Sequence, residues 1–268
     1  MAPKRLTDIA RAAGAPHATL MPGLNHHDDD PNLVELFELL APLVEELHPL
    51  RIEDLGLDED ESSSEPLGEQ AARVLAYVCE QLGVTPPRVV VRDALADDIQ
   101  GAGVNPPLLL VGTDAQVNSD ARELAFRFAR ALTLISPGRL SVAWRPAQVA
   151  RAYLLAALCA TYPSLGIPSD PEGQIRAILR GLNKIEGLEA AVKETVRSLR
   201  GRVERVNIGG WKRAIHRTAD RVGLLLCGDL TTAGVVLSAL EPDAQLDLID
   251  FALSQQYGAL RQKLGLSL

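Results

Sequence analysis

The amino-acid sequence predicts a mainly α-helical protein with a small β element, which is an α+β fold. Apolar residues recur at helical spacing, between capping signals, over most of the 268 residues. Aromatic residues make up only 4% of the chain, so its core must consist mainly of Leu, Val, Ile and Ala, a composition that favours helices. Only the short segments 88–92 and 107–112 have the composition of strands.

The first 66 residues are the most acidic part of the chain. They hold 15 of its 35 acidic residues but 4 of its 27 basic residues, so the formal charge of −8 divides into −11 and +3. Apolar spacing predicts an amphipathic helix over Leu33–Leu47, after a cap at Asp30-Pro31. Acidic residues and three serines from 53 to 66 predict a flexible linker. We therefore expect an acidic, partly disordered arm (1–66) followed by a helical domain (67–268).

This second region begins with a helix and two strands. The helix is expected over Leu67–Leu82, where Gly83 ends it, and the strands over Arg88–Arg92 and Pro107–Gly112. The glycines of Gln100–Val104 indicate a turn between the strands.

A long helix over Asp120–Ile135 follows, with Ser119 as its expected cap. Its apolar residues occur on nearly all sides, which predicts that it is buried. The rest of the chain is predicted to be helical, over Pro146–Thr161, Pro171–Leu182, Ile185–Arg200, Gly210–Leu226, Leu230–Leu240 and Asp243–Leu260.

Two segments of this second region resemble a known family. The long helix contains Glu123-Leu124 followed by apolar residues, and the later segment reads His216-Arg217-Thr218-Ala219-Asp220-Arg221-Val222-Gly223-Leu224. Over residues 68–240 the chain resembles gluzincin zinc metallopeptidases of the CAAX prenyl-protease and heat-shock membrane-protease family. Members of that family have an E-L-x-x-V-L-x-H-E-x-x-H helix and a later E-x-x-A-D-x-x-G-L helix. The resemblance implies a zincin-like fold.

The same resemblance implies that the zinc site is gone. The family's first histidine ligand, its general base and its second histidine fall on Arg130, Ala131 and Leu134, and its glutamate ligand falls on His216. Only the supporting aspartate, Asp220, is kept. A catalytic zinc needs three protein ligands and a base for its water, so we expect no catalytic residues, metal or cofactor. Because a buried charge needs a partner, we also predict an Arg130–Asp220 ion pair in place of the metal.

The stretch from Arg176 to Arg221 is basic, with twelve Lys or Arg against five acids. It could be solvated helix surface, a docking surface for an acidic protein or for the acidic arm, or a nucleic-acid site. The net negative charge and the scarcity of aromatic residues disfavour nucleic acid. The candidate binding surface consists of Arg197, Arg200, Arg202, Arg205, Lys212, Arg213 and Arg217.

Other signals give weaker hypotheses. Cys79, Cys159 and Cys227 are an odd number of separated thiols, typical of reduced cysteines in a cytoplasmic protein, and a cysteine nucleophile has no motif to support it. His26-His27 and the acids after them could bind a metal, but a solvated loop is the simpler interpretation. No segment is apolar over the length of a membrane span.

The function predicted from these observations is that of a catalytically inactive, metallopeptidase-like domain that binds or scaffolds a protein partner, as one piece of a larger assembly. The alternatives are a hydrolase with a non-standard site and nucleic-acid binding through residues 176–221.

Overall fold

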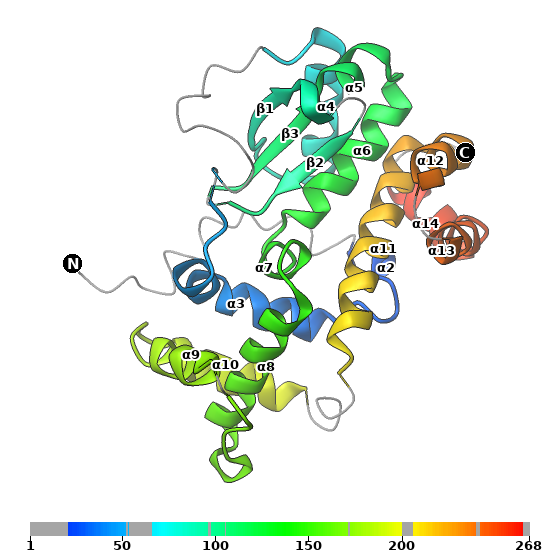
Figure 1. The fold of residues 1–268 in the computed structure, drawn as a ribbon. Helices are drawn as coiled ribbons and strands as arrows, with labels where there is room; N and C mark the ends of the chain where they lie inside the picture. The colour runs from blue at the N-terminus through cyan, green and yellow to red at the C-terminus, as the bar shows by residue number, and fades with distance from the viewer. Residues whose placement is uncertain are drawn as a thin grey trace. The chain divides into compact units, whose positions relative to one another are not determined.

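The computed structural model describes residues 21–51, 53, 66–95, 98–104, 106–170, 172–199, 206–239 and 242–264. It is mainly helical, with one small sheet among these residues, as the sequence predicts (Figure 1). The chain divides into two compact units. The described part of unit 1 lies within Asp28–Leu50 and Ser136–Arg213, and that of unit 2 lies within 21–27, Arg51–Ile135 and Ala214–Leu268.

Unit 1 is a bundle of helices built around α3 (Pro31–Leu47). Asp30 caps α3 by accepting a hydrogen bond from the backbone N–H of Asn32, so the predicted start is confirmed. The other elements of the bundle are α7 (Leu140–Ala143), α8 (Ala147–Thr161), η4 (Pro163–Leu165), α9 (Gln174–Leu182) and α10 (Leu188–Ser198).

Helix α3 packs against α7, α9 and α10, and α8 packs against α9 and α10. The buried residues of α3 are Leu33, Leu36, Phe37, Leu40, Leu43 and Val44. The amphipathic helix of the acidic N-terminal region is therefore a core helix of unit 1. Most of the acidic linker expected over residues 53–66 lies outside the described residues.

Unit 2 contains a three-stranded sheet in the order β1 (Arg88–Arg92), β3 (Leu108–Gly112) and β2 (Ile99–Ala102). Strand β1 runs parallel to the central strand β3, whereas β2 runs antiparallel to it. All five residues of β3 are buried. The turn predicted over Gln100–Val104 is wrong, because Ile99–Ala102 is a strand whose small residues, Gly101 and Ala102, are buried where β2 packs against α6.

Helices α4 (Glu69–Leu82) and α6 (Ala121–Leu134) pack together, and α6 also contacts α12 (Leu230–Val236). The predicted end of α4 is confirmed, since Gly83 closes it with a left-handed φ of 60°. The remaining elements of unit 2 are α2 (Met21–Leu24), η3 (Asp93–Leu95), α5 (Thr113–Asn118), η6 (Leu237–Ala239), α13 (Pro242–Ala252) and α14 (Gln255–Lys263). Helix α11 (Ile208–Cys227) is shared, because its first six residues belong to unit 1 and the rest to unit 2.

Several predicted boundaries are corrected by the structure, among them the start of α10, which is Leu188 instead of Ile185, and the end of α12, which is Val236 instead of Leu240. Asp120, not Ser119, caps α6, because its carboxylate accepts hydrogen bonds from the backbone N–H groups of Arg122 and Glu123. Helix α9 begins at Gln174 instead of Pro171. The single helix predicted over Asp243–Leu260 is two helices, because Ser254 caps a new one.

No helix within the described ranges has both the length and the hydropathy that crossing a membrane requires.

Candidate functional site

Two pairs of residues from the peptidase-like motifs come together in unit 2, where α6 meets the second half of α11. Gly223 allows the two helices to approach closely, because a Cβ atom at that position would lie 2.8 Å from Cδ2 of Phe126 and 3.1 Å from its carbonyl oxygen. Ala219, one turn earlier on α11, is fully buried. The small residues of the Ala219-Asp220-x-x-Gly223 sequence therefore have a packing role at this helix pair.

Arg130 of α6 and Asp220 of α11 form an ion pair at the same helix pair. The Nε of Arg130 donates to Oδ1 of Asp220 at 2.6 Å, so the ion pair predicted from the sequence is confirmed. The side chain of Asp220 is 3% exposed and that of Arg130 is 25% exposed. Burial raises the pKa of Asp220, and the positive charge and hydrogen bond of Arg130 act against that rise.

The other positions aligned with the zinc site differ in character. Ala131 and Leu134 are buried apolar residues of the α6 core, with 2% and 4% exposure. His216 is half-buried on α11, one turn before Asp220. Alanine, leucine and a protonated arginine offer no lone pair to a cation, so α6 supplies no ligand at these three positions.

A second polar cluster in unit 2 was not predicted from the sequence. His26 is buried, its Nε2 lies 3.2 Å from Oδ1 of Asp247, and Arg221 makes two hydrogen bonds to the same carboxylate at 2.7 and 3.1 Å. The backbone N–H of His26 also donates to the hydroxyl of Thr218. Burial alone would raise the pKa of Asp247, but the hydrogen bonds of His26 and Arg221 and the charge of Arg221 lower it to about 2.

This cluster changes the interpretation of the first histidine of the His26-His27 pair. The solvated loop that the sequence indicates is wrong for His26, because the structure places this residue in a buried contact with Asp247 and within 3.4 Å of Arg217. The metal-ligand hypothesis stays a prediction. Neither partner is near His26 in sequence, which is why no local pattern could reveal the cluster.

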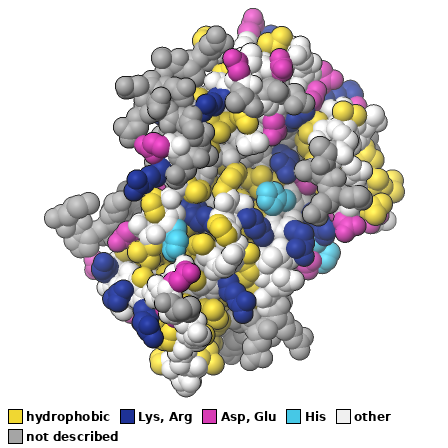
Figure 2. Space-filling model, in the orientation of Figure 1, with side chains coloured by type: hydrophobic (Ala, Val, Ile, Leu, Met, Phe, Trp, Pro, Cys, Tyr) yellow, Lys and Arg dark blue, Asp and Glu magenta, His cyan; other side chains and the backbone are white. Residues whose placement is uncertain are grey.

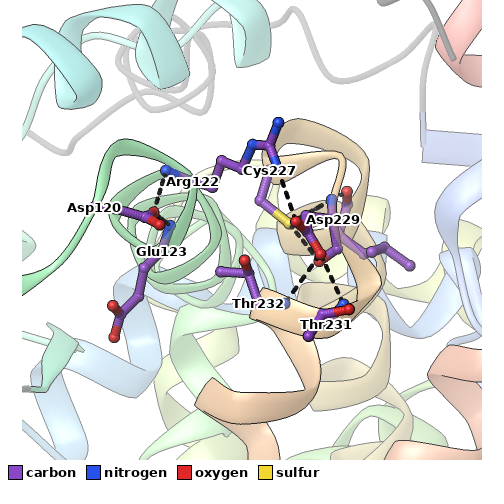
Figure 3. Close-up of polar contacts among 8 residues, drawn as sticks. Asp120, Arg122, Glu123, Cys227, Asp229, Thr231 and Thr232 are labelled. Atoms are coloured by element: carbon purple, nitrogen blue, oxygen red, sulfur yellow. Dashed lines mark hydrogen bonds and ion pairs between the residues drawn. The ribbon is translucent and has the colours of Figure 1, made fainter.

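Figure 3 shows how α6 and α12 begin side by side in unit 2. Asp120 caps the first helix, and Asp229 caps the second by accepting from the backbone N–H groups of Thr231 and Thr232. Arg122 donates to Asp229 at 2.8 Å and so links the two capped ends. The pKa of Asp229 is lowered, first of all by its hydrogen bond from the backbone of Thr232. Each aspartate here has a structural role at a helix end.

The cysteines lack the environment of a nucleophile. Cys227 is buried, and burial raises its pKa to about 11, as it also does for Cys79. Burial likewise raises the pKa of Cys159, whose thiol donates to the carbonyl oxygen of Gly166. A thiol with a raised pKa stays protonated near neutral pH and is a poor nucleophile.

Unit 1 holds a buried ion pair of its own. Asp29 and Arg139 have side chains that are 0% and 6% exposed, and Nη2 of Arg139 donates to Oδ2 of Asp29 at 2.8 Å. The indole N–H of Trp211 donates to the other carboxylate oxygen at 3.2 Å. Asp29 therefore connects the start of α3 with Arg139 and with Trp211, which lie elsewhere in unit 1.

The candidate basic surface is divided in the structure. Arg197, Lys212 and Arg213 lie in unit 1, Arg217 lies in unit 2, and Arg200, Arg202 and Arg205 lie outside the described residues. Arg197 pairs with Glu194, and Nζ of Lys212 donates to the carbonyl oxygen of Arg145, where burial lowers the lysine pKa. These two cations therefore have internal partners.

Unit 1 also has an open groove with a volume of about 990 Å³. Its walls come from α8, the η4 turn, the end of α10 and the start of α11. The lining residues are Ala147, Gln148, Arg151, Leu154, Leu155, Leu158, Tyr162, Ser164, Leu165, Val196, Val206, Asn207, Ile208 and Gly209.

No protein-family model, curated protein or solved structure matches this chain. The zincin fold and the peptidase kinship implied by the sequence stay predictions.

Proposed function

We propose that this protein is a catalytically inactive, metallopeptidase-like domain that acts as a protein-binding or scaffolding module, as one piece of a larger assembly. The observation that carries the proposal is the Arg130–Asp220 ion pair at 2.6 Å. It joins the two helices whose sequences resemble the peptidase motifs, with a guanidinium in the position of a histidine ligand. A fixed positive charge there disfavours a divalent cation by electrostatic repulsion.

The remaining motif positions support the loss of zinc chemistry. Ala131 cannot accept a proton from a metal-bound water, and Leu134 cannot bind the metal. Each is buried in the α6 core, so the helix is kept for packing. A domain that retains such a core without the reactive groups has binding as the simplest remaining role.

Metal content and activity of the purified full chain test the proposal. We expect substoichiometric zinc after dialysis and no zinc-dependent cleavage of a general peptide library. Stoichiometric zinc, together with turnover that His216→Ala abolishes, would overturn it and favour the hydrolase alternative.

The scaffolding role has its own test, which is cross-linking and affinity capture with the full chain as bait. We expect a protein partner whose capture saturates with bait concentration. A bait that lacks only residues 54–65 tests the acidic linker. Deleting all of residues 1–66 would remove the core helix α3 and unfold unit 1.

A further inference from the structure

We propose that the open groove of unit 1 binds an acidic amphipathic helix of a partner protein. This inference rests on the proposed protein-binding function and names the partner's chemistry. The groove lies wholly within unit 1, and it does not involve the Arg130–Asp220 site.

One wall of the groove follows one face of α8. Arg151, Leu155 and Leu158 recur at spacings of four and three, and Tyr162 continues this row after the helix ends. From Ala147 to Leu158 this wall extends about 16 Å along the helix axis, the length of roughly three helical turns. A helix laid along α8 would therefore meet Gln148 and Arg151 near the start of α8 and Leu154, Leu155 and Leu158 near its end.

Several of these apolar side chains are open to solvent. Leu165 is 64% exposed and Tyr162 is 38% exposed, while Leu155 and Leu158 are half-buried. Figure 2 shows hydrophobic side chains at the lower end of the visible face, where the segment that follows α8 lies in Figure 1, with Lys and Arg side chains near them. Contiguous exposed apolar surface on a protein marks an interaction site more often than isolated residues do.

The groove is open, and apolar side chains that line it remain exposed. Clefts for small ligands have volumes of roughly 300–1,000 Å³ and bury about 70–90% of the ligand's surface. The volume of this groove, about 990 Å³, is at the upper end of that range, and Tyr162 and Leu165 are exposed to solvent. An elongated ligand that covers the opening, such as a helix, buries more of this surface.

The charge of the groove selects an acidic partner. None of the described residues that line it is acidic, and Arg151 is an exposed cation for which the described residues provide no acidic partner. By contrast, Lys193 and Arg197 of the neighbouring α10 are paired with Glu189 and Glu194. An acidic side chain on the bound helix would complete an ion pair with Arg151, and the polar groups of Gln148 and Asn207 could hydrogen-bond at the rim.

The test uses two fluorescent helical peptides of 16 residues and the full-length protein. Both peptides carry leucines at positions i, i+3 and i+7, and their other positions are glutamate-rich in one peptide and lysine-rich in the other. Fluorescence anisotropy should give saturable binding of the acidic peptide, at least about tenfold tighter than that of the lysine peptide. Equal affinities, or no binding of the acidic peptide at millimolar protein, would overturn the proposal.

Variants locate the binding. Arg151→Glu should weaken binding of the acidic peptide by about tenfold and strengthen that of the lysine peptide, and Leu165→Ser should weaken both by about tenfold. Both residues are exposed, so the fold should tolerate these changes. Arg176→Glu, an exposed arginine of α9 outside the groove, is the matched control and should change affinity less than about twofold.

The groove inference and the proposed function can fail separately. If a captured natural partner binds the Arg151→Glu, Leu165→Ser double variant as well as it binds the unaltered chain, the groove inference is wrong and the binding function stands. If the protein cleaves peptides with zinc, the proposed function is wrong whatever the peptide affinities are.

Discussion

Asp29 of unit 1 and Asp220 of unit 2 are both buried aspartates paired with arginines, but their surroundings differ. Asp29 accepts from Arg139 through one carboxylate oxygen and from Trp211 through the other, and both charged side chains are almost fully buried. Asp220 has one hydrogen bond from Arg130, whose guanidinium remains a quarter exposed. Both oxygens of Asp29 are thus bonded by buried donors, whereas the cation that pairs with Asp220 still reaches water.

The difference suggests a different role for each of the two buried ion pairs. The Asp29 site holds the beginning of α3 against Arg139 and Trp211, so its role is structural. The Arg130–Asp220 pair lies on two helices with peptidase-like sequences, and burial raises the pKa of Asp220 in spite of the pairing. The proposed function would explain its less complete pairing, because in that proposal the arginine takes the place of a metal ligand.

The largest expected effect is that of Asp29→Ala. The change leaves the Arg139 guanidinium buried without its carboxylate and the Trp211 N–H without its acceptor. Removing one partner of a buried ion pair costs about 3–5 kcal/mol, so we expect a loss of that order in the free energy of unfolding measured with urea. Glu35→Ala, an exposed acid on α3, is the control and should change stability by less than about 0.5 kcal/mol. Equal effects of the two variants would show that the Asp29 pair has no structural role.

Arg130→Ala should have a smaller effect, about 2–3 kcal/mol at pH 7, and this effect should depend on pH. Without the guanidinium, the pKa of the buried Asp220 rises further above its usual 3.8. A carboxyl whose folded-state pKa is raised favours the folded state below its unfolded-state pKa, and that contribution is lost as the pH rises through the folded-state pKa. The loss in free energy of unfolding that Arg130→Ala causes should therefore become smaller as the pH falls from 7 towards 4.

Urea unfolding of Arg130→Ala at pH 7, 5.5 and 4 measures this trend. Arg122→Ala is the matched control, because Arg122 is an exposed arginine of the same helix that also pairs with an aspartate. This variant should show little change in the free energy of unfolding at any of the three pH values. If the stability loss of Arg130→Ala grows as the pH falls, Asp220 does not have the raised pKa described above.

Gly223→Ala probes the close approach of α6 and α11 with the smallest expected effect. The added Cβ would lie under 3 Å from the Phe126 ring, so we expect a loss of about 1–2 kcal/mol. Gly234→Ala on α12 meets no atom within 4 Å and should instead stabilise the protein by up to about 1 kcal/mol, because alanine is the better helix former. If Gly223→Ala melts at a higher temperature than Gly234→Ala, the close approach of α6 and α11 does not depend on a glycine at position 223.

Local signals predicted much of the fold. The Asp30 cap, the left-handed Gly83 and the apolar spacing of α6 each depend on neighbours within a few residues, and the structure has them where the sequence indicates. The strand β2 was missed, because Gly101 reads as a turn residue until its packing against α6 is known.

Long-range contacts were predicted only where a motif linked the two partners. The Arg130–Asp220 pair joins residues 90 positions apart, and the spacing of the peptidase motifs connected them. The Asp29–Arg139 and His26–Asp247 contacts join residues that are even farther apart in sequence, but no motif links them, and the acids near Asp29 resemble a solvated loop. The groove beside α8 likewise depends on packing that no single segment encodes.

The measurement that tests the central claim most directly is zinc binding by a variant with the ligands restored. Arg130→His, Leu134→His and His216→Glu together place the family's three ligands on α6 and α11 and leave Asp220 to orient one of them. If these helices form a peptidase frame that has lost its metal site, the folded variant should bind about one equivalent of Zn²⁺ by calorimetry, whereas the unaltered protein should not. A variant with the unaltered helical circular dichroism spectrum that binds no zinc would contradict the account.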